Sequence, residues 1–426
     1  MIYYLCIMPA CHDKQISTIV LITDAFPFGA VTESSFIIPE LKALTAGGRR
    51  VVVIPTTRLT AEPAADLATL GIEVCTGWAD SAVWRRPWLR ALRVLQPEVW
   101  TLAAGTSDLR TSLSFTASAK AFASWLRGWI KREKIDTDAT LFYTFWFDFP
   151  TSALALLARR MPLRYISRAH RHDIYTRRAP RLRSMTIASS QGIYPVSQAG
   201  VDELSTRFPD KSGKLKVSRL GSVLPSAQII TKRHSVADHA ITLLSVSRVT
   251  AIKRVSLNLE MAKALAIARP GTTVTWIHAG DGPLMADLRT AAQDPSLPTN
   301  LRIELPGELP NEAIHRLYSE RTIDWFMLLS TSEGLPIVLC EAMSHGVPVI
   351  ATDAGGTAEI VTDDTGLLLP VDVTPEEFVR GMLPYLESPA RAESLSHGAA
   401  ELWRNALNAE TLREDFVARI LAQNTI

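Results

Sequence analysis

The chain has 426 residues, of which 47% are hydrophobic and 21% are charged. This length and composition indicate a folded protein of about two domains and exclude a disordered chain. The four cysteines show no CxxC spacing, so we expect neither a zinc site nor a disulfide framework, and a reducing cytoplasm as the compartment.

Charge is distributed unevenly behind the net value of +2. Residues 1–230 carry 29 lysines and arginines against 18 aspartates and glutamates, whereas residues 231–426 carry 16 against 25. Opposite charges on the two halves indicate two bodies with different partners. The basic half would favour an anionic partner: a phosphorylated ligand, a membrane surface or nucleic acid.

The N-terminus reads as an extension of the fold. Its apolar run, residues 2–8, has no basic residues before it and is too short for the core of a signal peptide. No run elsewhere approaches the roughly 18 apolar residues that span a bilayer. We expect residues 1–15 to precede the fold, which would start near Ile16.

Strand and helix patterns alternate along the first half. A helix containing one proline is predicted over 33–48, and strands are predicted over 17–29, 49–57, 140–148 and 163–170, the first of which runs into a loop.

The second half shows the same alternation more regularly. Helices are predicted over 256–271, 311–321 and 336–346, and strands over 241–249, 273–282, 301–309, 323–334 and 347–352. Apolar strands that alternate with helices indicate a parallel sheet covered on both faces.

The fold class is therefore α/β, with two Rossmann-like doubly wound domains. The N-terminal domain would cover 1–230 and the C-terminal domain 231–400, with a link near 225–237. Residues 401–426 would form a helical tail, for which packing back on the N-terminal domain is one arrangement.

Two glutamates flank the short helix that starts at Pro336. Glu333 lies in the loop before it, Glu341 in its second turn, and the amides of Gly334 and Leu335 near its N-terminus. A helix N-terminus binds anions such as phosphate, and a carboxylate accepts paired hydrogen bonds from a vicinal diol, as in ribose or a hexose. The alternative is a pair of capping or solvated glutamates.

Two cations follow the first strand of the second half. Arg248 ends the segment SVSR, and Lys253 stands five residues later at the start of the next helix. Ligands of doubly wound sheets bind beyond the carboxyl ends of the strands, where two fixed cations can neutralise a diphosphate without a metal ion. Solvated basic side chains are the alternative.

The glycines of AGDGP (279–283) favour a tight turn beside the ligand, because the full GxGxxG pattern of a dinucleotide site is missing. There is also no closely spaced aspartate pair of the kind that holds a metal diphosphate. We therefore expect no metal ion.

These motifs follow one another in a characteristic order over 241–372. The order is SVSR with Lys253, HAGDGP (278–283), EGLPIVLCE (333–341) and GVPVIATDAGGTAEIV (346–361). The set resembles the nucleotide-sugar-binding domain of the retaining family 4 glycosyltransferases (glycosyltransferase group 1), in which two Rossmann-like domains of the GT-B fold face each other across a cleft. The resemblance includes bacterial exopolysaccharide and lipopolysaccharide members.

The resemblance implies a site for a UDP- or GDP-linked sugar donor and no additional cofactor. Glu341 would hold the ribose hydroxyls, Glu333 the donor hexose, and Arg248 and Lys253 the diphosphate, while the loop at 307–309 would border the base. The implied donor-binding residues are Gly29, Arg248, Lys253, Gly280, Gly282, Gly307, Glu333, Gly334, Leu335, Pro336 and Glu341.

The first half resembles the family less closely. The loop FPFGAVTES has one glycine, Gly29, where a Gly-Gly pair is common, and its Thr32 and Glu33 would lie on the acceptor side. The segment SRAHRHDIY (167–175) matches better. It implies a catalytic His170 near the reacting hydroxyl. His172 and Asp173 would lie on the acceptor side, where one of them could simply orient the loop. The implied catalytic group is His170, Glu333, Arg248 and Lys253.

The implied reaction moves a hexose to a glycan or lipid-diphosphate-linked acceptor in cell-surface polysaccharide biosynthesis, with the configuration at C1 retained. No nucleophile is apparent, so the leaving diphosphate would accept the proton of the acceptor. The alternatives are another GT-B enzyme, such as a sugar-nucleotide epimerase or an inverting transferase, and a nucleic-acid-binding protein. No recognised nucleic-acid motif is present, so we expect no nucleic-acid partner. The oligomeric state cannot be read from the sequence.

Two features bear on the acceptor. Residues 159–183 hold nine arginines and one acid, which favours either an anionic acceptor or a solvated basic face. The segments 84–95 and 122–134 place tryptophan and leucine opposite basic residues, which suits either core packing or contact with the inner face of the cytoplasmic membrane.

Overall fold

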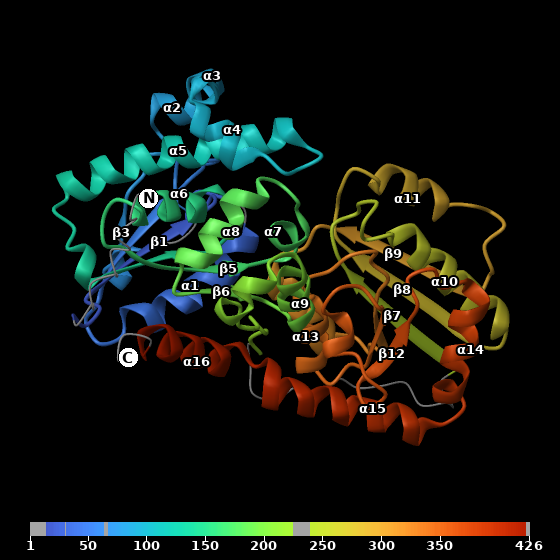
Figure 1. Cartoon of the computed structure of the whole chain (residues 1–426). Coiled ribbons are helices and arrows are strands. Elements are labelled where there is room, and N and C mark those ends of the chain that lie inside the picture. The colour runs from blue at the N-terminus through green and yellow to red at the C-terminus, as the bar shows by residue number, and fades with distance from the viewer. Residues whose placement is uncertain (1–13, 30, 64–66, 225–238, 423–426) are drawn as a thin grey trace. The chain divides into compact units, whose positions relative to one another are not determined.

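The computed structural model describes residues 14–29, 31–63, 67–224 and 239–422, which form two compact units (Figure 1). The N-terminal unit comprises Met1–Ser218 and Arg413–Ile426, and the C-terminal unit comprises Arg219–Leu412. Most of the predicted extension and the predicted link near 225–237 lie outside the described residues.

A six-stranded parallel sheet forms the centre of the N-terminal unit. Its spatial order is β3-β2-β1-β4-β5-β6, so the direction of winding reverses between β1 and β4. The strands are β1 (Thr18–Thr23), β2 (Arg50–Pro55), β3 (Glu73–Val74), β4 (Thr140–Thr144), β5 (Arg164–Ala169) and β6 (Gly192–Pro195).

Helices cover both faces of this sheet. The helices are α1 (Val31–Thr45), α2 (Ala82–Arg85), α3 (Pro87–Ala91), α4 (Pro97–Ala103), α5 (Leu109–Arg132), α6 (Phe149–Ala158), α7 (Arg171–Tyr175), α8 (Pro180–Ser189), α9 (Gln198–Arg207) and most of α16 (Ala409–Ala422). Of these, α3 and α4 pack on α5 and α2 packs on α3, so these three form an outer layer (Figure 1). In β1, Val20 and Ile22 pack into the core beneath α5 and α6, whereas Ile19 and Leu21 pack into the core beneath α1 and α16. Alternating residues of one strand therefore supply two separate cores, because successive side chains point to opposite faces.

The C-terminal unit repeats the same architecture. Its parallel sheet has the order β12-β11-β10-β7-β8-β9, with the reversal between β7 and β10. The strands are β7 (Ala240–Val246), β8 (Thr273–Ala279), β9 (Leu301–Gly307), β10 (Trp325–Leu328), β11 (Val349–Thr352) and β12 (Gly366–Leu369). The helices are α10 (Val255–Ala268), α11 (Met285–Ala291), α12 (Asn311–Glu320), α13 (Ile337–Ser344), α14 (Pro375–Leu386) and α15 (Pro389–Leu402).

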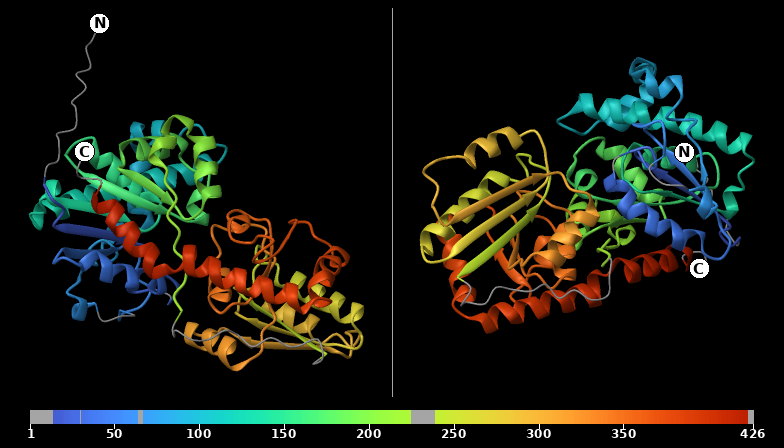
Figure 2. Two further views of the ribbon diagram at one scale, coloured as in Figure 1. Left: turned by 90° about the horizontal axis from the view of Figure 1, so that it is seen from below. Right: turned by 180° about the vertical axis from the view of Figure 1, so that it is seen from behind.

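The last helix, α16, completes the core of the N-terminal unit. The helix lies along the sheet face that also carries α1 (Figures 1 and 2), and its Phe416 belongs to the apolar core on that face. Its ring lies 3.7 Å from the guanidinium carbon of the buried Arg168. Arg168 in turn pairs with buried Glu40 at 2.9 Å and donates to the Tyr143 hydroxyl and to Ser218.

The predicted strand over 140–148 is shorter than expected. β4 ends at Thr144, and the remaining residues form a loop that leads into α6, where Asp148 caps the helix by accepting a hydrogen bond from the Phe149 amide. The aromatic residues 145–147 continue the apolar strand pattern past the end of β4. A helix start signal, Asp148 two residues before Pro150, follows at once.

The two amphipathic segments fold differently. In the segment 122–134, Phe122, Leu126 and Trp129 are buried in the core beneath α5, so that stretch is ordinary core packing. The segment 84–95 forms the end of α2, then α3 and a 3₁₀ turn, and in it Trp88 is 58% exposed and Leu95 80% exposed. Within the described ranges, no helix is both long and apolar enough to cross a membrane.

Candidate functional site

Three predicted site residues of the C-terminal unit flank the reversal of its sheet. Arg248 and Lys253 follow β7, and Glu333 follows β10, which is the neighbour of β7 in the sheet. Because the strands are parallel, these loops leave the same edge. Ligands of doubly wound folds bind at this position.

Lys253 and Glu333 form an ion pair across this reversal. Lys253 Nζ lies 2.6 Å from Glu333 Oε1, and the side chain of Glu333 is only 7% exposed. Arg248 is exposed, and no described residue forms a hydrogen bond or ion pair with its side chain. The edge therefore carries one cation held in place and one cation that is available to a ligand.

The start of α13 lies in the same loop. The helix begins at Ile337, directly after Pro336, and the Gly356 amide donates to the Gly334 carbonyl at 2.8 Å, which fixes the loop before it. The first amides of a helix have no partner within the helix and carry partial positive charge. Together with Gly334 and Leu335 they form a place where phosphate oxygens can bind.

Glu341 lies half-buried on the second turn of α13. The amide of Asn311, the first residue of α12, donates from Nδ2 to Glu341 Oε1 at 3.0 Å. Burial raises the pKa of Glu341 to about 7, and the hydrogen bond from Asn311 lowers it by less. The Glu341 carboxyl can therefore gain or lose its proton near neutral pH, which was not predicted from the sequence.

The glycines of the C-terminal unit allow two loops to pack closely. A Cβ on Gly280 would lie 1.9 Å from the Ser247 carbonyl oxygen, and a Cβ on Gly282 would lie 2.4 Å from that of Val249. Both contacts involve the loop that carries Arg248. The Gly280 amide also donates to the carbonyl of Gly307 at 2.8 Å. These glycines therefore shape the edge, independently of any contact with a ligand.

In the N-terminal unit, Glu33 organises the loop that follows β1. Its Oε2 accepts hydrogen bonds from the amides of Ala25 and Phe26 at 2.9 and 2.7 Å, and its Oε1 accepts from the amide of Asp24 at 3.0 Å and from Trp146 Nε1 at 2.8 Å. Both oxygens are thus engaged in holding the loop.

The other two predicted residues of this loop differ. A Cβ on Gly29 would lie 2.4 Å from the Cβ of Ala25, so glycine fits a tight turn there. Thr32 lies in the first turn of α1, and its side chain is outside the described ones.

His170 lies half-buried after β5, against two aromatic rings. Its ring centroid is 4.4 Å from that of Trp146 and 4.8 Å from that of Phe145, and its Nε2 donates to the Phe145 carbonyl at 3.0 Å. Burial and the charge of Arg168 lower the pKa of His170 to about 3, against the hydrogen bond to Phe145, which raises it. His170 is therefore a neutral imidazole whose Nε2 is committed to the main chain in this conformation.

Asp173 is buried at the start of α7. Its Oδ2 accepts hydrogen bonds from the amides of Phe147 and His170 at 2.7 and 3.1 Å, while its Oδ1 has no hydrogen-bond partner among the described residues. Burial raises the pKa of Asp173 to about 7; the two amides, and after them Arg183, lower it. A buried carboxylate oxygen without a partner is costly unless a ligand or water satisfies it.

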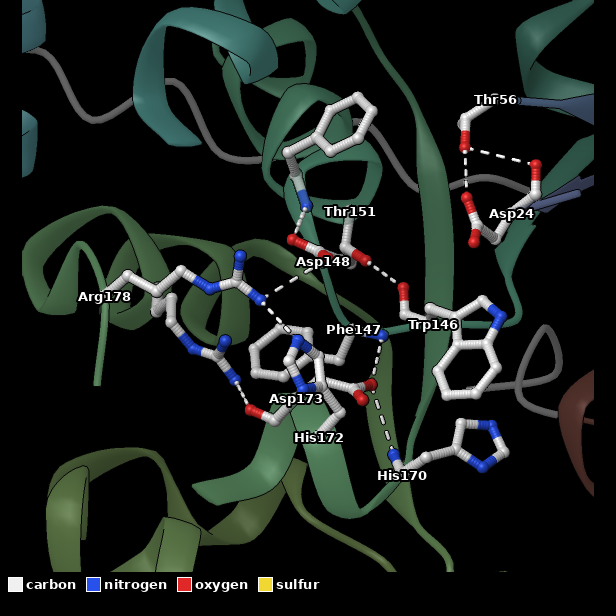
Figure 3. Close-up of polar contacts among 12 residues, drawn as sticks. Asp24, Thr56, Trp146, Phe147, Asp148, Thr151, His170, His172, Asp173 and Arg178 are labelled. Atoms are coloured by element: carbon white, nitrogen blue, oxygen red, sulfur yellow. Dashed lines mark hydrogen bonds and ion pairs between the residues drawn. The ribbon is translucent and has the colours of Figure 1, made fainter. Parts of the chain in front are cut away.

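His172 and Asp148 share one arginine. Arg178 Nη2 donates to His172 Nε2 at 3.2 Å and lies 3.5 Å from Asp148 Oδ2 (Figure 3). Asp148 and Arg178 lie 30 positions apart in the sequence, so only the fold brings them together.

A pocket of about 300 Å³ lies where the N-terminal sheet reverses, between the ends of β1 and β4. Figure 3 shows most of its polar residues, which come from the ends of β1, β2, β4 and β5. The polar and aromatic residues that line it are Thr23, Asp24, Thr56, Trp146, Asp148, Phe149, His172 and Asp173. Of these, only His172 and Asp173 were predicted; Asp148 and Trp146 were missed because their segment was assigned to a strand.

The nine arginines of residues 159–183 do not form one exposed face. Arg164, Arg168 and Arg183 are buried, and Arg183 donates to the main-chain carbonyl of Asp173 at 2.6 Å. Arg159 pairs with Glu98. The run of arginines therefore serves in large part to hold the N-terminal unit together.

Among the described residues, no group of three or more His, Cys, Asp or Glu side chains is arranged to hold a metal ion. Metal independence and the absence of a cofactor stay predictions.

Comparison with known proteins connects this geometry to a family. Residues 227–402 match the family model described as "Glycosyl transferases group 1". Among curated proteins, the amylovoran biosynthesis glycosyltransferase AmsK of Erwinia amylovora is 28% identical over 212 residues, which cover 48% of this chain and 49% of AmsK. The chain thus spans about half, or less, of the length of the curated relatives it matches first.

Solved structures resemble the whole chain. Sucrose-phosphate synthase from Thermosynechococcus elongatus aligns with a TM-score of 0.66 at 16% identity, covering 95% of this chain and 98% of that one. Anabaena HepE in complex with UDP aligns with a TM-score of 0.60 at 17% identity, covering 95% and 99%. Two parallel six-stranded sheets with helices on both faces confirm the predicted GT-B fold class.

Proposed function

We propose that this chain, whose residues 227–402 match the family model described as "Glycosyl transferases group 1", transfers a hexose from a nucleoside diphosphate sugar to a sugar-containing acceptor in cell-surface polysaccharide biosynthesis. The observation that carries this proposal is the Lys253–Glu333 ion pair at the sheet reversal, beside the start of α13. The relation to a glycosyltransferase of amylovoran biosynthesis supports the class of acceptor.

The donor would occupy the edge of the C-terminal sheet. Arg248 and Lys253 would bind the diphosphate together with the first amides of α13, because two cations and a helix N-terminus are the groups that neutralise phosphate. Glu333 would hold the hexose hydroxyls and Glu341 those of the ribose, and the loop at Gly307 would border the base. The UDP complex of HepE makes a uridine nucleotide the first donor to test.

The transfer would retain the configuration at C1. The acceptor oxygen bonds to C1 on the face from which the diphosphate leaves, the bond from C1 to the diphosphate oxygen breaks, and the acceptor proton passes to that leaving oxygen. Lys253, Arg248 and the positive end of α13 stabilise the charge that develops there, so the chain's part is positioning and electrostatics.

His170 would act near the reacting hydroxyl by shape and hydrogen bonding. Its low pKa and its donation to the Phe145 carbonyl argue against a protonated imidazole at neutral pH. We therefore assign it the placement of the acceptor next to Trp146.

An exposed apolar patch would place the chain at the inner face of the cytoplasmic membrane. The patch consists of Trp88, Leu92, Leu95 and Trp100, which are between 49% and 80% exposed, beside the exposed Arg85 and Arg86. Apolar side chains flanked by arginines bind anionic lipid surfaces. The double variant Trp88→Ser/Leu95→Ser should lose co-sedimentation with phosphatidylglycerol vesicles. Leu284→Ser, an exposed leucine of the C-terminal unit, should not.

The transferase proposal is tested with a panel of UDP- and GDP-linked sugars in a thermal-shift assay, followed by a hydrolysis assay. At least one nucleotide sugar should raise the melting temperature of the wild type and release its nucleoside diphosphate. Glu341→Ala should lose the shift, and Glu320→Ala, at the exposed end of α12, should keep it. No shift with any nucleotide sugar would contradict the proposal, and a sugar epimerised while still attached to its nucleotide would favour the epimerase alternative.

A further inference from the structure

The pocket of the N-terminal unit is lined by polar and aromatic side chains, none of which belongs to the proposed donor site. It measures about 300 Å³ and belongs entirely to the N-terminal unit, at the reversal between β1 and β4. A volume of this size is at the lower end of the range for small-molecule sites, which suits one ring with its substituents.

The chemistry of the lining is that of a carbohydrate-binding site. Trp146 and Phe149 supply aromatic rings, against which the C–H face of a sugar ring can pack. Thr56 supplies a hydroxyl, and Asp24 and Asp148 supply carboxylate oxygens, which only accept hydrogen bonds when ionised. Ring hydroxyls can donate to such oxygens in pairs.

One carboxyl oxygen of the pocket lining is free to accept a hydrogen bond from a ligand. Asp173 lines the pocket, is 1% exposed, and its Oδ1 has no hydrogen-bond partner among the described residues. Its Oδ2 is held by the amides of Phe147 and His170. The carboxyl is thus fixed in orientation with one oxygen left over, which is the arrangement of a ligand-binding group rather than of a solvated acid.

The charges around the pocket exclude an anion. Three aspartates and one histidine are among the described lining residues, and no lysine or arginine is. Two arginines lie next to the lining without belonging to it: Arg178, which pairs with Asp148 at 3.5 Å and donates to His172 at 3.2 Å, and the buried Arg183, which donates to the main-chain carbonyl of Asp173 at 2.6 Å. A phosphate or carboxylate in the pocket would face the carboxylates of Asp24 and Asp148 without a lysine or arginine in the described lining to bind it, and uncompensated like charges disfavour binding.

We propose that this pocket receives an uncharged, hydroxyl-rich sugar ring and excludes a ring that carries a carboxylate or a phosphate. The proposal rests on the proposed function, in which this ring is the reacting end of the acceptor. Any anionic part of the acceptor must then lie outside the pocket. The sequence favoured either an anionic acceptor or a solvated basic face from the nine arginines of residues 159–183, three of which are buried by the fold.

The test compares neutral rings with counterparts that carry a carboxylate or a phosphate at C6. Binding is measured by saturation-transfer difference NMR and competition, using methyl glycosides of glucose, galactose, mannose and N-acetylglucosamine and their uronic-acid or 6-phosphate counterparts. For the wild type we expect at least one neutral glycoside to bind, and to bind about tenfold or more tightly than its anionic counterpart.

Two variants locate the effect. Asp148→Asn keeps the cap of α6, since asparagine caps helices as well as aspartate, but removes one charge from the lining. Combined with Asp24→Asn, it should reduce the discrimination to about threefold or less. Asp210→Asn, an exposed aspartate outside the pocket, should leave the discrimination unchanged.

The outcomes separate this inference from the proposed function. Equal affinity of the wild type for neutral and anionic rings overturns the inference, as does unchanged discrimination in the double variant. Absence of glycoside binding, while nucleotide sugars still raise the melting temperature, overturns the inference and leaves the proposed function standing. Discriminating glycoside binding without any nucleotide-sugar binding supports the pocket and contradicts the transferase.

Discussion

Glu341 makes donor binding depend on pH in a way that can be measured. Burial raises the pKa of this carboxyl to about 7, well above the ordinary value for glutamate. Ribose hydroxyls donate more strongly to a carboxylate than to a carboxylic acid. Nucleotide-sugar binding should therefore tighten as the pH rises through about 7.

The magnitude follows from the pKa. The carboxyl of Glu341 is about one tenth ionised at pH 6 and about nine tenths ionised at pH 8, given a pKa of about 7. Affinity that requires the ionised form should rise about tenfold between these two conditions, which corresponds to about 1.4 kcal/mol. In Glu341→Gln the amide carries no charge at either pH, so that rise should disappear.

Isothermal titration calorimetry with UDP-glucose and GDP-mannose measures this directly. A nucleotide sugar is the appropriate probe, because its diphosphate is esterified at both ends, whereas the terminal phosphate of a free nucleoside diphosphate titrates near pH 6. A 2′,3′-dideoxy nucleotide sugar should bind without the pH dependence, and Glu320→Gln should behave as the wild type. Equal dissociation constants at pH 6 and pH 8 in the wild type would refute the reasoning, as would an undiminished rise in Glu341→Gln.

Three further outcomes are expected. Lys253→Met should lower the rate of sugar transfer by about 10²–10³-fold, because it removes a cation from the proposed diphosphate site; Lys263→Met, further along α10, should leave that rate unchanged. Arg168→Met should lower the free energy of unfolding by about 3–5 kcal/mol in urea titrations, since it leaves the Glu40 carboxylate buried without its cation. A smaller loss of stability in Arg168→Met/Glu40→Leu would verify this cause, and an equal loss would count against it. Burial raises the pKa of Asp173 to about 7, so the folded chain keeps a proton that the unfolded chain releases from about pH 4 upward. This group should therefore lower the free energy of unfolding by up to about 1.4 kcal/mol for each pH unit as the pH rises to about 7. In Asp173→Asn the dependence of unfolding free energy on pH should be flatter, and an unchanged dependence would assign it to other groups.

The fold was largely predictable because its strands are apolar and its helices alternate with them. Runs such as 241–249 and 347–352 have few other uses than buried parallel strands, and both appear as β7 and β11. The loops of the C-terminal site were predictable for the same reason. Once strands are parallel, their carboxyl ends meet at one edge, so Arg248 and Glu333 had to be near each other.

The contacts that escaped prediction join residues far apart in sequence. Glu40 and Arg168 are 128 positions apart, and nothing in either segment shows that the arginine is buried. The loop with Trp146 and Asp148 was predicted as part of a strand, because its aromatic residues continue the apolar pattern of β4 beyond Thr144. The pKa of Glu341 depends on burial between α12 and α13, which periodicity alone does not determine.

The last helix has a consequence for how the chain is made. Phe416 and Ile420 of α16 fill the core of the N-terminal unit, beside strands that leave the ribosome first. Until α16 has been synthesised, the sheet face that its Phe416 and Ile420 help to cover has, among the described helices, only α1 on it. A truncated variant that ends after Leu412 would lack this cover and should expose Tyr143 and Tyr194, whose rings contact Phe416.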